Sequence, residues 1–110
     1  MPKHEFGLMN SPPVESKRYD KYNPEEYDNL ISVDDNYIMR MADELNEIHM
    51  YWHTLKNSQK RLAYCGITLI PPEAAAEMLL ITEKYPELKQ LIRLLEKARE
   101  ENKYIIHFGI

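Results

Sequence analysis

The run from Leu62 to Pro72 constrains the fold more than any other part of the chain, because it is uncharged in a protein whose residues are 29% charged. One alternate set of its side chains is wholly apolar and comprises Ala63, Cys65, Ile67 and Leu69. Such alternation, among β-branched and aromatic residues, is typical of a strand with one face on a core. Pro71 and Pro72 have no N–H for a sheet and favour a helix start. The run therefore predicts a central strand that leads into a helix.

Three amphipathic helices are expected around that strand. The first covers residues 36–47, where Asp34 is a suitable N-cap and apolar residues recur at intervals of three and four. The second covers residues 73–84 and ends before Pro86, because a residue that precedes proline avoids the helical region. The third covers residues 87–101, and its continuous apolar stripe comprises Leu88, Leu91, Ile92, Leu95 and Ala98.

The segment 49–55 has two interpretations. Trp52 and Leu55 continue the apolar spacing of the first helix, which favours a longer helix. The residues Tyr51–Thr54, however, are four poor helix formers that are favoured in strands. A hairpin in which residues 49–55 pair with residues 61–70 across a polar turn is the preferred interpretation, and the helical extension is the alternative.

Two further strands are expected, at residues 29–33 and 104–110. The resulting order, β-α-β-β-α-α-β, predicts an α+β fold with a small, mainly antiparallel sheet and three helices packed on one face. The C-terminal strand is strongly apolar and needs a partner. The uncharged central run is the expected partner.

Residues 1–27 differ in composition from the rest of the chain. They hold four of the seven prolines and show no helical periodicity, which is typical of an extended segment. They also hold more apolar area than a solvated tail, in Phe6, Leu8, Met9, Tyr19, Tyr22 and Tyr27. We therefore expect an extended N-terminal arm, residues 1–27, packed on a single domain formed by residues 28–110.

Charge and cysteine content exclude several classes of protein. The formal net charge is −4 and is spread evenly, so a nucleic-acid partner is not expected. No secretory leader and no apolar run of about 20 residues are present, which argues against export and membrane insertion. Cys65, the single cysteine, lies on the apolar side of the central run and is expected to be a buried core residue. A cytoplasmic location follows as the expectation.

A histidine- and tyrosine-rich sheet face is the candidate ligand site. If the helices cover the side that holds Trp52, Cys65, Ile67 and Ile106, the opposite face presents His49, Tyr51, His53, Tyr64, Thr68 and His107. These side chains donate and accept hydrogen bonds, and histidine does so near neutral pH. The arm would cover that face and add Arg18 and Tyr19 as candidate contacts. The alternative is a half-polar sheet surface with no ligand.

Metal binding has only weak support. His49 and His53 share one face in either secondary structure, but their spacing lacks the glutamate of a His-Glu-x-x-His motif. Hydrogen-bonded or exposed histidines are the simpler interpretation, so no metal and no cofactor are expected. No glycine-rich phosphate loop or Gly-x-Ser-x-Gly elbow occurs in the sequence.

The chain resembles a small family of short proteins from Gram-positive bacteria that has no assigned activity. The matching pieces are Lys17–Asp20, Tyr51–Leu55, Leu62–Gly66 and Leu69–Pro72. In the similar sequences the stretch between the second and third pieces carries glycine and proline, which implies a hairpin turn. The resemblance implies no mechanism. The leading expectation is a non-catalytic protein-binding or regulatory module, with a homodimer as one form of partner, and the alternative is a small-ligand or metal-binding domain, at most a minor enzyme.

Overall fold

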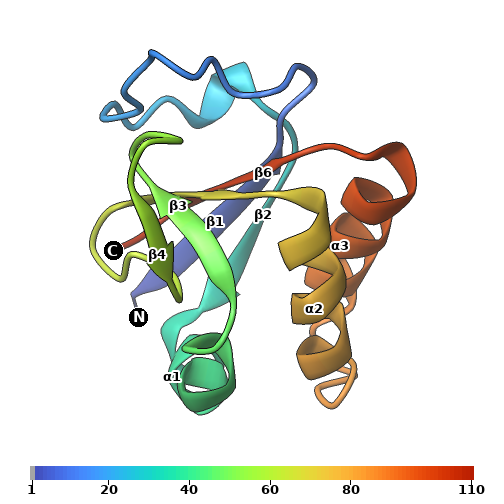
Figure 1. The fold of residues 1–110 in the computed structure, drawn as a ribbon. Helices are drawn as coiled ribbons and strands as arrows, with labels where there is room; N and C mark the ends of the chain where they lie inside the picture. Colours follow the sequence, from blue (N-terminus) through green and yellow to red (C-terminus); the bar gives the residue numbers. More distant parts are fainter. Residues whose placement is uncertain (1) are drawn as a thin grey trace.

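The computed structural model describes residues 2–110, which form a six-stranded antiparallel sheet with three α-helices, the α+β class that the sequence predicts (Figure 1). The strands are β1 (Lys3–Leu8), β2 (Asp28–Asp34), β3 (His49–Trp52), β4 (Ser58–Lys60), β5 (Ile67–Ile70) and β6 (Ile105–Phe108). The helices are α1 (Asp35–Leu45), α2 (Pro72–Thr82) and α3 (Lys89–Glu101), and a 3-10 turn spans Pro24–Glu26. The strand order in the sheet is β2-β1-β6-β5-β3-β4.

Two sequence-based strand predictions are confirmed at the centre of the sheet. The uncharged run pairs with the C-terminal strand, since β5 lies antiparallel to β6 with Ile67 opposite Phe108. The segment 49–55 is a strand over its first four residues, so the helical extension is wrong, and β3 pairs with β5 as predicted. Its hairpin partner, however, is β4, which lies in the stretch expected to be the polar turn. The chain leaves the sheet at His53, whose φ of 64° lies in the left-handed region.

The three helices pack on one face of the sheet. The larger hydrophobic cluster joins them to the sheet and includes Phe6, Leu8, Met50, Ile70, Ile105, Met78, Leu91 and Leu95. The predicted stripe of α1 supplies Ile38, Met41 and Leu45, all buried. The helix begins where predicted, because the Asp34 side chain accepts a hydrogen bond from the Asn36 N–H and caps it.

The N-terminal residues contribute in two different ways. Residues 3–8 form β1, which pairs with β2 on one side and β6 on the other, so a central strand lies within the segment expected to be an arm. Residues 9–27 cover the second face of the sheet, and Figure 1 shows this connection at the top, across the molecule from α1. The smaller hydrophobic cluster lies beneath it and comprises Met9, Tyr19, Ile67, Leu69, Ile106 and Phe108, with Tyr27 and Tyr51 against its edge.

The two faces do not divide the side chains as the alternation predicts. Ile67 and Ile106 belong to the cluster beneath residues 9–27 rather than to the helix-covered cluster. Both faces are buried, so alternation alone cannot identify the face that the helices cover. The buried position predicted for Cys65 is also wrong, because β5 begins only at Ile67 and Cys65 lies exposed in the preceding turn.

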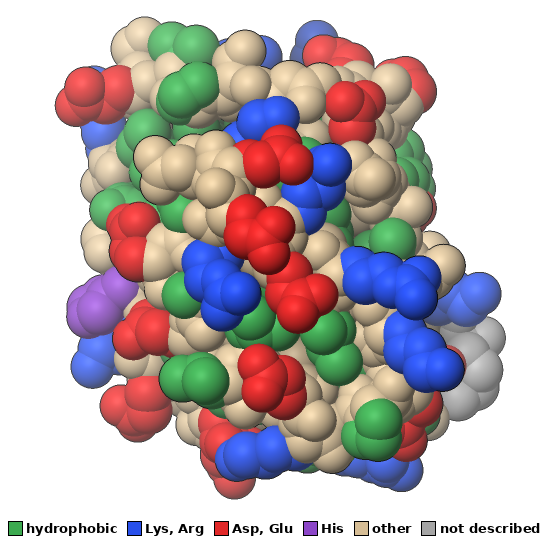
Figure 2. Space-filling model, turned by 90° about the vertical axis from the view of Figure 1, so that its right-hand side faces the viewer, with side chains coloured by type: hydrophobic (Ala, Val, Ile, Leu, Met, Phe, Trp, Pro, Cys, Tyr) green, Lys and Arg blue, Asp and Glu red, His purple; other side chains and the backbone are tan. Residues whose placement is uncertain are grey.

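The helix-covered side of the molecule carries charges of both signs. Figure 2 shows this side, where Lys and Arg side chains lie among Asp and Glu side chains without a single-sign patch. No helix within residues 2–110 has the length and apolar character needed to cross a bilayer.

Candidate functional site

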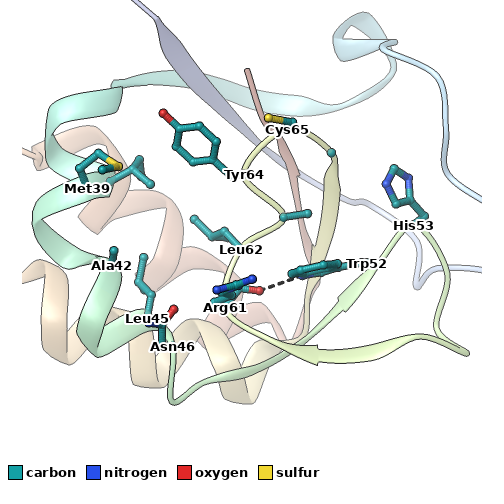
Figure 3. A pocket seen from close by; sticks show the side chains of 13 residues that line it. Met39, Ala42, Leu45, Asn46, Trp52, His53, Arg61, Leu62, Tyr64 and Cys65 are labelled. Atoms are coloured by element: carbon teal, nitrogen blue, oxygen red, sulfur yellow. Dashed lines mark hydrogen bonds between the residues drawn. The ribbon is translucent and has the colours of Figure 1, made fainter.

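An open groove lies between α1 and residues 61–66, the loop that leads into β5 (Figure 3). Its volume is about 650 Å³, within the range of small-ligand and peptide pockets. Residues of α1 form one wall, the 61–66 loop forms the other, and the end of β3 closes one side. The lining residues are Ile38, Met39, Ala42, Leu45, Asn46, Trp52, His53, Arg61, Leu62, Ala63, Tyr64, Cys65 and Gly66.

The walls of the groove are mainly apolar. Met39 lies next to the buried stripe of α1 and is 58% exposed, so its thioether is available to a bound molecule. Ala42 follows on the same face of the helix and leaves room because its side chain is small. Across the groove Tyr64 is 40% exposed. An exposed methionine and an exposed tyrosine facing one cavity favour contact with a partner molecule.

Trp52 and Arg61 are held together at one end of the groove. The indole Nε1–H of Trp52 donates to the Arg61 carbonyl at 2.9 Å, the bond drawn in Figure 3. The Arg61 guanidinium lies 5.8 Å from the centre of the indole ring, a cation–π distance. The bond fixes the backbone of Arg61 and leaves its charged group exposed.

Two residues of the groove have left-handed backbone conformations. The φ angles are 76° at Arg61 and 64° at His53. Such conformations are costly for residues other than glycine and concentrate at binding sites. At His53 the surroundings compensate, since its ring Nδ1 lies 3.0 Å from the Tyr19 carbonyl and its own carbonyl accepts from the Tyr19 N–H.

A buried polar chain runs from the start of α1 into the sheet beside the groove. His4 Nε2 lies 2.9 Å from Asp35 Oδ1, and His4 Nδ1 lies 2.8 Å from His107 Nε2. His107 Nδ1 in turn lies 3.0 Å from Thr68 Oγ1. His4, Thr68 and His107 are fully buried. Asp35, His4, His107 and Thr68 are called the polar chain below.

Proton positions in the polar chain follow from its two ends. A carboxylate only accepts, so His4 Nε2–H donates to Asp35 and His4 Nδ1 accepts from His107 Nε2–H. His107 Nδ1 must then accept, and the Thr68 hydroxyl donates to it. Both imidazoles are neutral in this assignment, and each ring nitrogen has one partner. Every hydrogen bond points toward Asp35.

The polar chain is attached to the groove wall at both ends. The Ala63 N–H donates to Thr68 Oγ1 at 2.8 Å. The Tyr64 hydroxyl donates to Asp35 Oδ2 at 2.8 Å. Ala63 and Tyr64, which are consecutive in the 61–66 loop, are therefore held by opposite ends of the polar chain.

The electrostatics of the site agree with a neutral imidazole at His107. Burial, and then the proximity of His4, hold the pKa of His107 well below its ordinary value. Hydrogen bonds from His4 and then from Tyr64 lower the pKa of Asp35. The hydrogen bond to that carboxylate raises the pKa of Tyr64. At neutral pH the Asp35 carboxyl is therefore ionised and the His107 imidazole is neutral.

The polar chain is not arranged for nucleophilic catalysis. Thr68 Oγ1 would be the nucleophile of such a chain, but it is buried and already accepts from the Ala63 N–H. A substrate carbonyl would have no approach to it. Within residues 2–110 no group of three or more His, Cys, Asp or Glu side chains is placed to hold a metal ion.

The structure separates the six residues expected on one open sheet face. Thr68 and His107 lie in the polar chain on the helix-covered face, and Tyr64 lies above them in the groove wall. Tyr51 packs against the smaller cluster on the other face. His49 is exposed on β3, and His53 lies at the groove edge facing residues 9–27.

The two candidate residues of the arm do not line the groove, although Tyr19 is bonded to His53 at its edge. Tyr19 is buried, and its hydroxyl accepts from the Val14 N–H at 2.9 Å. Arg18 is exposed and pairs with Asp20 at 2.7 Å. Tyr19 thus anchors the covering segment, and Arg18 contributes a surface ion pair of small energetic weight.

Sequence reasoning missed His4, Asp35 and the α1 side of the groove. Residues 3–8 alternate Lys3, His4, Glu5, Phe6, Gly7 and Leu8, with polar and small residues on one parity. That pattern predicts a strand with His4 on the buried face together with Phe6 and Leu8. The proline content of residues 1–27 hid this signal.

No family model matches the chain, and neither a curated protein nor a solved structure gives a significant match. The resemblance to Gram-positive proteins stays a prediction. The groove and the polar chain therefore carry the functional inference.

Proposed function

We propose that this chain is a non-catalytic protein-binding module that takes a short apolar segment of a partner in the groove between α1 and the 61–66 loop. The observation that carries the proposal is the groove itself, in which Met39 and Tyr64 are exposed opposite each other beside Trp52. A methionine beside aromatic rings adapts to apolar side chains of different shape.

Charge narrows the class of partner segment. Arg61 is the exposed cation of the groove lining, and its backbone is fixed by Trp52. A carboxylate next to the apolar residues of the partner would form a charge-assisted hydrogen bond with the guanidinium. The proposed occupant is therefore a short peptide segment with one or two large apolar side chains flanked by Asp or Glu.

Trp52 supplies a direct test, because it is the single tryptophan of the chain and lies in the groove. Blocked pentapeptides with two apolar residues next to glutamate, lysine or serine would be titrated while indole fluorescence and amide NMR shifts are recorded. We expect the glutamate peptide to bind most tightly, with shifts concentrated on α1 and the 61–66 loop. Absence of binding by every peptide, or shifts elsewhere, would contradict the proposal.

Matched variants locate the binding. Met39→Glu places a carboxylate in the apolar groove and should weaken peptide binding at least about tenfold, or by about 1.4 kcal/mol. Leu80→Glu is the control, because Leu80 is also an exposed helical residue, at 69%, and is not part of the groove lining. Equal weakening in both variants would argue against the groove.

A small-ligand function is the second candidate, because two residues expected at a ligand site, His53 and Tyr64, line the same groove. A rise in melting temperature on addition of Zn²⁺, Ni²⁺ or a small aromatic carboxylate would favour this function, provided that His53→Gln removes the rise. The proposed setting of either function is the cytoplasm of a bacterial cell, where the exposed thiol of Cys65 would stay reduced.

A further inference from the structure

The attachment of the groove wall to two buried histidines implies regulation of the groove. This inference rests on the proposed function, since it concerns occupancy of the same site. Ala63 and Tyr64 are held by side chains at opposite ends of the polar chain. The wall therefore depends on the direction of the hydrogen bonds between those ends.

We propose that uptake of a proton by the His4–His107 pair releases the 61–66 loop and reduces binding of partner segments in the groove. At neutral pH the pair has one hydrogen between its two facing nitrogens, which are 2.8 Å apart. The groups that face the pair are Asp35 of α1, Tyr64 of the loop and Thr68 of β5.

Other neighbours of the pair offer no compensating charge. Phe6 lies on His107 at a ring distance of 4.9 Å, on the same face of β1 as His4. Glu5, the next residue along β1, lies on the other face and accepts from the Tyr22 hydroxyl. Among residues 2–110, Asp35 is the one carboxylate hydrogen-bonded to the histidine pair, and it already accepts from His4 and Tyr64.

A single added proton reverses part of the polar chain. If His4 gains the proton at Nδ1, that nitrogen becomes a donor and His107 Nε2 must accept. The hydrogen of His107 then moves to Nδ1 and points at Thr68 Oγ1, which can no longer donate there. Thr68 Oγ1 would receive hydrogens from both His107 and the Ala63 N–H, while its own hydrogen has no acceptor in the chain.

Rotation of Thr68 or loss of the Ala63 bond relieves this conflict. Either change removes the support of the groove wall at Ala63 and leaves the Tyr64–Asp35 bond as its one side-chain support from the polar chain. The β5–β6 pairing stays intact, because that pairing uses backbone groups. A second proton would place two donors face to face between His4 and His107. Loop release therefore precedes loss of the sheet as the pH falls.

Amide NMR of the free protein tests the switch without any peptide. As the pH is lowered from about 7.5 to below the ordinary histidine pKa of about 6.5, we expect the amide signals of Ala63 and Tyr64 to shift together and the exchange of the Ala63 N–H to accelerate. Ring-nitrogen NMR should show one proton entering the hydrogen-bonded pair at the same midpoint, while far-UV circular dichroism stays unchanged.

Variants separate the buried pair from the other two histidines, the exposed His49 and the half-buried His53. His107→Gln should abolish the transition of the wall amides, whereas His49→Gln and His53→Gln should leave it in place. Should His107→Gln fail to fold, the ring-nitrogen midpoints of the unaltered protein decide the matter. The proposal would be overturned if His53→Gln abolished the pH-dependent shift of the Ala63 and Tyr64 amide signals. It would also be overturned if those signals shifted only when the whole protein unfolds.

Peptide titrations then connect the switch to binding. The affinity of the glutamate pentapeptide should fall by up to about tenfold per pH unit below the midpoint if release of one proton is linked to binding. If the peptide binds but the Ala63 and Tyr64 amide signals show no pH-dependent transition, the switch is refuted and the binding proposal stands. A wall transition without binding of any peptide would refute the binding function alone.

Discussion

His4 and His107 are in direct contact, with 2.8 Å between His4 Nδ1 and His107 Nε2, although they stand 103 positions apart in the chain. Their rings stack at a centroid distance of 5.1 Å. The contact joins β1 to β6, the first and last strands, in the interior of the sheet. It connects both ends of the chain to α1 through Asp35.

The pH dependence of stability should reveal the buried pair. The pKa of His107 is depressed by burial, so the unfolded chain binds more protons than the folded one below about pH 6.5. The stabilisation is complete above that pH and is lost as the pH falls toward the folded-state pKa. We expect the free energy of unfolding to fall by up to about 1.4 kcal/mol per pH unit for this group.

Urea unfolding at a series of pH values measures this loss. The depressed pKa of Asp35 acts in the same direction at lower pH, because its stabilisation is lost as the pH falls through its folded-state pKa. In a plot of the free energy of unfolding against pH, His107→Gln should remove the slope just below about pH 6.5, and His49→Gln should not. A flat profile between about pH 6.5 and about pH 5 in the unaltered protein would contradict the neutral burial of His107.

Thr68→Val should destabilise the protein although it preserves shape. The change removes a hydroxyl that accepts from the Ala63 N–H and lies 3.0 Å from His107 Nδ1, so both groups lose their partner. A loss of about 1–3 kcal/mol is expected for buried groups left unpaired. Thr68→Ser keeps the hydroxyl and should lose less, as measured by chemical unfolding. A loss in Thr68→Val that is no larger than the loss in Thr68→Ser would contradict the prediction, because the buried hydroxyl would then contribute no more than the methyl group.

Part of the fold follows from the sequence because its signals are local. The α1 stripe, the Asp34 cap and the proline start of α2 each depend on neighbouring residues, and the structure confirms them. The pairing of β5 with β6 was predictable from their shared lack of charge. Which sheet face lies under the helices was not, because Ile67 and Thr68 are both buried, one on each face.

The polar chain was beyond prediction for a different reason. Two of its members, Thr68 and His107, were candidates on chemical grounds, but their partner His4 lies in a segment whose prolines indicated a covering arm. Their contact depends on β1 inserting between β2 and β6, a long-range choice that no local pattern encodes. The groove likewise needs the spacing between α1 and the 61–66 loop, which only the packed structure sets.

Gly109→Ala should be much more damaging than Gly66→Ala, although both glycines lie beside the 61–66 loop. A Cβ on Gly109 would overlap the Tyr64 carbonyl oxygen, a backbone atom held by the Ile110 N–H. At Gly66 the nearest atom is His53 Nε2 at 2.7 Å, the end of a side chain that can turn aside.

We expect Gly109→Ala to cost about 1–3 kcal/mol and to shift the NMR signals of Tyr64, with a smaller cost for Gly66→Ala. The free energy of unfolding from urea titrations gives the comparison. A larger cost at Gly66 would mean that the His53 ring is rigidly fixed in the groove wall.

Tyr19 should hold residues 9–27 against the sheet. Its ring is 7% exposed and belongs to the cluster with Leu69 and Phe108, and its backbone pairs with His53. Tyr19→Ala removes this anchor and should cost about 3–5 kcal/mol, in the range of buried aromatic truncations. Tyr22, which is 65% exposed, is the matched control from the same segment, and Tyr22→Ala should cost far less.

Limited proteolysis distinguishes release of this segment from general unfolding. If residues 9–27 form a locally stable cover, Tyr19→Ala should speed cleavage within them before cleavage elsewhere, because local opening exposes that backbone first. Release of the segment would also break the hydrogen bonds between His53 and Tyr19. The amide signal of His53 should therefore shift in the variant whose residues 9–27 are cleaved faster. Simultaneous cleavage throughout the chain would instead show that the cover and the sheet unfold as one cooperative unit.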